Sequence, residues 1–146
     1  MKEIHIVVGV LAIALNAAAA LWGAFCWWRA RRSVLFWRLL RAGQLVVVIE
    51  VALGGALLAL GRKTPGLHIL YGILPLLVAF IAEQLRVSSA QMVLDARGIE
   101  SAAAVGKLEQ SEQRAVVVAI VQRELGVMVL AAIVIVVLLA RAAATA

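Results

Sequence analysis

Apolar residues occur in four long runs separated by short polar stretches. The runs cover residues 4–28, 39–60, 67–85 and 115–140. Each is close to or above the length of about 20 helical residues that crosses a hydrocarbon layer about 30 Å thick. The pattern predicts an all-α integral membrane protein, a bundle of four transmembrane helices that forms a single domain over residues 1–146.

Composition agrees with a chain whose solvent is lipid. Apolar residues make up 65% of the sequence and charged residues 15%, whereas soluble domains contain about 45–50% and about 25%. The net charge is +6, but the basic residues concentrate in the polar gaps, where they orient helices in a membrane. We therefore expect the lipid bilayer as partner, with a homo-oligomer or a larger membrane complex left open, and no nucleic acid.

The basic residues also predict an orientation. Residues 29–41 contain five arginines and no acid, whereas the basic residues of 61–66 are only Arg62 and Lys63. Cytoplasmic loops carry the excess of positive charge, so residues 29–41 and 86–114 are predicted in the cytoplasm and both termini outside. The chain is then a multi-pass protein of the cell membrane, the inner membrane where there are two.

Residues 86–114 form the one sizeable polar segment. They are mostly helix formers, interrupted by Gly98 and Gly106. The segment is predicted to be helical and to extend the third and fourth helices into the cytoplasm. Ser111 is a candidate N-cap of the fourth helix, because its hydroxyl suits the free amide groups there.

An internal repeat carries the two histidines. Residues 4–11, Ile-His-Ile-Val-Val-Gly-Val-Leu, align without gaps on residues 67–74, Leu-His-Ile-Leu-Tyr-Gly-Ile-Leu. The two copies open the first and third helices, which run in the same direction, so the chain is predicted to consist of two pseudo-repeated helical hairpins. His5 and His68 then lie at one depth, near the outer face.

Two neutral imidazoles on different helices are the axial ligands that a b-type haem takes in a helical bundle. Gly9 and Gly72 each follow a histidine by four residues. They lie on the same helix face one turn away, where the missing Cβ lets a flat macrocycle approach the backbone. His5 and His68 are therefore candidate haem ligands.

Other residues complete the predicted haem site. Arg62 and Lys63 lie in the short loop on the same side and are candidates to pair with the haem propionates. Tyr71, three residues after His68, is a candidate hydrogen-bond donor to a ligand or propionate.

Two other interpretations of the histidines remain open. In the first, His5 and His68 are interfacial residues close to helix ends, and the glycines serve helix packing. In the second, the histidines bind a divalent metal, which needs a further ligand such as Glu3, because two histidines are too few for a closed zinc site.

Glu50 is a carboxylate inside an apolar run. It lies roughly 16 Å from the outer end of the second helix at about 1.5 Å per residue, near the bilayer midplane. A charge there costs at least about 2.5 kcal/mol, so Glu50 is either a proton or ion site or a protonated packing residue. Asn16 is a candidate neighbour at a similar depth, and Pro75 is predicted to kink the third helix.

Charged residues near the inner ends of the third and fourth helices leave one question open. Glu83 and Arg86 are three residues apart and are predicted to form an ion pair. Residues 122–124, Gln-Arg-Glu, either interrupt the fourth helix inside the membrane or form an interfacial cluster.

Two adjacent glycines in the second run, Gly54 and Gly55, are predicted to supply a small face for close contact with another helix.

No motif of soluble catalysis occurs in the sequence. There is no phosphate-binding glycine loop, no His-Glu-x-x-His and no Cys-x-x-Cys. An autonomous enzyme is therefore not expected. Three functions remain: a haem-binding electron-transfer or quinone-linked subunit, a non-catalytic scaffold or accessory subunit, and a small oligomeric transporter with a path past Glu50.

Overall fold

The computed structural model describes residues 2–146, and in that range every regular element is an α-helix. In chain order these are α1 (Lys2–Trp28), α2 (Val34–Ala59), α3 (Gly66–Val87), α4 (Ser89–Ala96), α5 (Ala102–Val105) and α6 (Gln110–Ala144). Helices α1, α2, α3 and α6 are long and apolar enough to cross a membrane. The prediction of four such helices is confirmed.

Two helices begin earlier than hydropathy predicts. Helix α2 starts at Val34, because the Ser33 hydroxyl caps it and accepts a hydrogen bond from the Phe36 amide at 3.2 Å. The loop is thus short, and Arg38 and Arg41 belong to α2. Helix α6 starts at Gln110 with Glu109 as its N-cap residue, so the prediction of Ser111 as N-cap is wrong.

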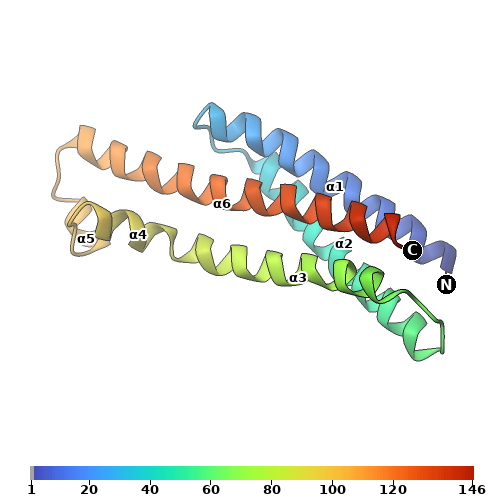
Figure 1. The fold of residues 1–146 in the computed structure, drawn as a ribbon. Coiled ribbons are helices and arrows are strands. Elements are labelled where there is room, and N and C mark those ends of the chain that lie inside the picture. Colours follow the sequence, from blue (N-terminus) through green and yellow to red (C-terminus); the bar gives the residue numbers. More distant parts are fainter. Residues whose placement is uncertain (1) are drawn as a thin grey trace.

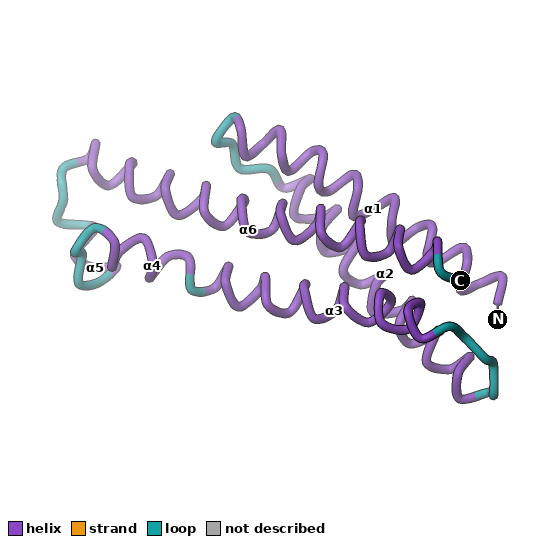
Figure 2. The backbone as a smooth tube through the Cα atoms, in the orientation of Figure 1, coloured by secondary structure: helices purple, strands orange, loops and turns teal. Residues whose placement is uncertain are grey.

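The long helices form two antiparallel hairpins, α1 with α2 and α3 with α6 (Figure 1). Helix α1 also packs along α6, whereas α2 and α3 make far fewer contacts. Figure 2 shows both termini and the loop between α2 and α3 at one end of the molecule. The loop between α1 and α2 and the short helices α4 and α5 lie toward the other end.

Small residues let the helices approach one another. Gly23 lies beneath the Phe36 ring, and a Cβ on Gly126 would lie 2.9 Å from the Trp27 ring. Around these contacts a central core joins α1, α2, α3 and α6. Its largest buried members are Phe36, Leu40, Leu125 and Met128. Such packing is typical of helices that associate without a hydrophobic driving force between them.

Much of the apolar surface faces outward. Leu21 and Trp28 are 76% and 77% exposed, and many other large apolar side chains on the four long helices are more than 40% exposed. Soluble monomers rarely expose contiguous apolar patches larger than a few hundred Å². The surface is typical of a multi-pass membrane protein.

The segment between α3 and α6 is helical but not continuous with α3. Helix α3 ends at Val87, and α4 and α5 follow before α6 begins. Val93, Leu94 and Val116 form a small separate core that holds α4 against the start of α6. Helix α6 has 35 residues, about 52 Å at 1.5 Å per residue, and so extends well beyond a layer of about 30 Å.

Candidate functional site

The two histidines meet at the end of the bundle where the termini lie. His5 is in the first turn of α1 and His68 is in the first turn of α3. Their ring centroids are 6.0 Å apart, and the ring planes make an angle of 73°. The fold therefore brings together the two histidines whose flanking residues align in the sequence.

A backbone carbonyl fixes the tautomer of the His68 ring. His68 Nδ1 lies 2.8 Å from the carbonyl oxygen of Ala142 near the end of α6. A carbonyl only accepts, so Nδ1 carries the proton and donates it. In a neutral imidazole this leaves Nε2 with its lone pair free.

The other histidine faces a carboxylate. His5 Nδ1 lies 3.0 Å from Glu50 Oε1, but the two groups are not aligned as a hydrogen bond. His5 Nδ1 and Glu50 Oε2 are buried atoms without a hydrogen-bond partner among the described residues. Buried polar atoms in native proteins are nearly always paired, so orphaned atoms beside a cavity indicate a site for a ligand or for water.

A cavity of about 520 Å³ opens beside both histidines, between α1, α2, α3 and the loop that joins α2 to α3. Its polar lining includes His5, His68, Glu50, Arg62 and Lys63. The remaining lining is mostly apolar, with side chains such as Ile6, Val51, Leu58, Ile69 and Ile73. The cavity combines an apolar interior with two imidazoles and a basic rim.

Of the glycines and the tyrosine predicted at the haem site, only Gly72 lines the cavity, whereas Gly9 and Tyr71 lie outside it. Gly72 lines the cavity, and a Cβ there would meet nothing within 4 Å. Gly9 does not line the cavity, because the Glu50 carboxylate fills the space next to it: a Cβ on Gly9 would lie 2.7 Å from Glu50 Oε1. Tyr71 is also outside the cavity lining, and its ring packs under the Arg141 guanidinium.

Glu50 is not an isolated carboxylate at the middle of the bundle. Its contact with His5 places it level with the first turn of α1. Asn16 is not its neighbour: the Asn16 amide donates to the Ala12 carbonyl at 2.8 Å and packs against Gly43. Sequence reasoning missed the contact between His5 and Glu50, because the crossing of α1 and α2 decides it.

A bare metal site of the expected kind is not formed. Within residues 2–146 no group of three or more His, Cys, Asp or Glu side chains lies close enough to hold a metal ion. Glu3, the expected third ligand, is exposed and does not line the cavity.

A charged network lies toward the other end of the bundle. Arg86 Nε lies 2.9 Å from Glu83 Oε2, which confirms the predicted pair within α3. Arg41 of α2 makes a second ion pair with the same carboxylate, with Nη1 2.6 Å from Oε1. Gln44 donates to Glu83 as well, at 3.1 Å. The network connects α2 to α3, which otherwise make few contacts.

Comparison of the chain with protein-family models, curated proteins and solved structures found no match. The function is therefore argued from the site itself.

Proposed function

We propose that the chain is an integral membrane protein in which α1, α2, α3 and α6 cross the bilayer. The outward-facing apolar side chains support this, as does the length of each helix. The arginines between α1 and α2 then lie on the cytoplasmic side with α4 and α5, and the termini and the histidine cavity lie near the outer face.

The two hairpins are proposed to be copies of one unit. His5 and His68 occupy the first turns of α1 and α3, which open the two hairpins. The hairpins pack through α1 and α6, and the histidine-bearing ends meet beside one cavity. A symmetric ligand site at the junction of two repeats is a recurrent arrangement in membrane proteins.

The cavity is proposed to hold a b-type haem with His5 and His68 as axial ligands. The spacing of the rings carries this proposal. An imidazole nitrogen lies about 2 Å from a metal ion that it binds, so two imidazoles that each direct a nitrogen at the same ion from opposite sides have centroids about 6 Å apart. The observed separation is 6.0 Å.

The surroundings of the rings support axial ligation. Histidine ligands usually donate their second ring N–H to a carbonyl or carboxylate, which orients the ring and raises its basicity. His68 makes this contact with the Ala142 carbonyl. The Glu50 carboxylate lies 3.0 Å from His5 Nδ1 without being aligned as a hydrogen bond, and it would accept from His5 once the two side chains reorient around a bound group. Nε2 of each ring is then the atom that binds iron.

The cavity suits a large flat group better than a bare ion. Its volume of about 520 Å³ lies in the range of about 300–1,000 Å³ typical of small-molecule sites. Arg62 and Lys63 at the rim match the charge of two propionates. The open space at Gly72 admits the macrocycle edge close to α3. A metal ion alone lacks a third protein ligand here.

Electron transfer follows from this coordination. An iron bound by a macrocycle and two histidines has no free position for substrate, so it changes oxidation state without binding a reactant. The protein is proposed to be an electron-transfer or quinone-linked subunit rather than an autonomous enzyme, with Glu50 as the group that handles a proton or ion beside the haem.

The test is the absorption spectrum of the chain purified in detergent from haem-replete cells. The wild-type protein is expected to show a Soret band, and His5→Leu or His68→Leu, which keep an apolar side chain of similar size, are expected to remove it. Tyr71→Phe is the matched control, because Tyr71 lies three residues from His68 but outside the cavity, and it should keep the band.

A colourless wild-type protein would overturn the haem proposal. The same cavity and Glu50 would then favour the transporter, for which Glu50→Gln should abolish a flux in vesicles while the fold is retained. An accessory subunit would show neither a band nor a flux.

A further inference from the structure

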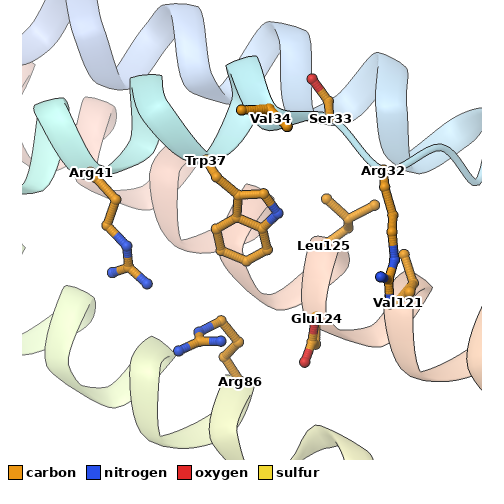
Figure 3. Close-up of a pocket in the computed structure, with 9 residues that line it drawn as sticks. All are labelled: Arg32, Ser33, Val34, Trp37, Arg41, Arg86, Val121, Glu124 and Leu125. Carbon is orange, nitrogen blue, oxygen red and sulfur yellow. The ribbon is translucent and has the colours of Figure 1, made fainter.

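A second cavity, of about 560 Å³, lies at the opposite end of the bundle from the histidines (Figure 3). Its basic lining comes from three arginines on three separate segments: Arg32 in the loop after α1, Arg41 on α2 and Arg86 on α3. Figure 3 shows Arg41 and Arg86 on one side of the Trp37 ring and Arg32 on the other.

Positive charge exceeds negative charge in this cavity. Arg41 and Arg86 share the single carboxylate of Glu83. Arg32 has no carboxylate within ion-pair distance among residues 2–146, and Glu124, the one acid that lines the cavity, makes no ion pair there. Guanidinium groups left with spare donors bind phosphate oxygens well, often through two parallel hydrogen bonds.

Apart from Ser33 and Glu124, the rest of the lining is apolar. Trp37 stacks against Arg41 and Arg86, whose guanidinium carbons lie 5.9 and 5.6 Å from its ring centroid. Val34, Val121 and Leu125 form the other apolar wall. Charged groups thus stand beside an apolar surface, which suits a ligand with a phosphate and a hydrocarbon part.

The position of the cavity favours a lipid headgroup over a soluble molecule as the source of the phosphate. Trp37 and the arginines lie at the start of α2 and the end of α3, the level at which these helices leave the bilayer in the membrane embedding proposed above. Tryptophan prefers this interface, and basic pockets between helices on the cytoplasmic side bind anionic headgroups. A lipid phosphate is present at that level at high local concentration, whereas a soluble phosphate is dilute.

We propose that the cavity lined by Arg32, Arg41, Arg86 and Trp37 binds the headgroup phosphate of an anionic phospholipid, whose acyl chains lie along the apolar wall. This inference rests on the membrane embedding but not on the haem.

The test measures lipid binding to the full-length chain in detergent by native mass spectrometry. The probes are phosphatidylglycerol, phosphatidylcholine of the same acyl chains, and inorganic phosphate. Arg32→Gln is the test variant, because Arg32 is exposed and holds no ion pair. Arg31→Gln is the matched control, since it removes the same charge from the adjacent position outside the cavity.

Wild-type protein is expected to bind phosphatidylglycerol about tenfold more tightly than Arg32→Gln, the effect of losing a charged hydrogen bond. Arg31→Gln should stay within about twofold of wild type, since an exposed charge outside the cavity contributes little. Equal loss in both variants, equal binding of phosphatidylcholine, or inorganic phosphate binding as tightly as the lipid would overturn the proposal. Resistance of the chain to alkaline extraction from membranes tests the embedding separately.

Discussion

At the scale of single residues, identical glycines have different roles. Gly23 leaves no room for a side chain beneath Phe36 and Val129, whereas Gly55 and Gly72 face open space beside the histidine cavity. The sequence predicts helix contact through Gly54 and Gly55, and both line the cavity. A Cβ on Gly54 would lie 3.5 Å from His5 Cε1 of α1, whereas a Cβ on Gly55 would meet nothing within 4 Å. The crossing of two helices decides whether a glycine packs against a neighbouring side chain or faces open space. The sequence alone therefore does not distinguish packed glycines from open ones.

Gly23→Ala is therefore expected to destabilise the fold by about 1–3 kcal/mol, because the added methyl group overpacks the contact with the Phe36 ring. Gly55→Ala adds the same methyl group to open space and should leave stability unchanged or raise it slightly through helix propensity. Thermal unfolding in detergent measures both. Equal midpoints for the two variants would contradict the packing described for α1 and α2.

Glu50 supplies a prediction about the proposed haem site. A carboxylate next to an axial histidine stabilises the more positive oxidised iron, so Glu50→Gln should raise the midpoint potential by tens of millivolts. A redox titration followed in the Soret region measures it. Glu3→Gln is the control, because its charge is exposed and screened and should barely change the potential. An unchanged or lowered potential in Glu50→Gln would show that Glu50 carries no negative charge next to the iron.

At the scale of elements, hydropathy predicts the four helices but not their ends. The apolar runs locate the part of each helix that is apolar enough to lie in lipid, whereas α2 and α6 begin five residues earlier, at Val34 and Gln110. The start of α2 depends on the Ser33 cap, a hydrogen bond that a hydropathy average does not register. Residues 122–124 lie well inside the longer α6, where Glu124 faces the arginine cavity.

The link between α2 and α3 is testable at Glu83. Glu83→Gln keeps the shape but removes the charge shared by Arg41 and Arg86, so it should lower stability by about 1–2 kcal/mol. The unfolding midpoint in detergent measures it, with Glu100→Gln, an exposed acid without an ion pair, as control. If both variants have the same unfolding midpoint as wild type, the network does not hold α2 to α3.

At the scale of the whole molecule, the matching segments at residues 4–11 and 67–74 predict the meeting of His5 and His68, since both segments open helices that run in the same direction. The sequence does not predict the groups that contact the two histidine rings. The Ala142 carbonyl approaches His68 only because α6 returns to the same end, and Glu50 meets His5 only because α1 and α2 cross there. Periodicity within one helix carries no information on either contact.

The proposed function depends most on the haem between the rings of His5 and His68. The most direct measurement is the haem content of the purified wild-type chain, from its pyridine haemochrome spectrum and its protein concentration. Close to one haem b is expected for each chain, with the oxidised form giving the low-spin spectrum of iron held by two imidazoles. A protein that is colourless after expression with ample haem, or that binds haem with a high-spin spectrum, would contradict it.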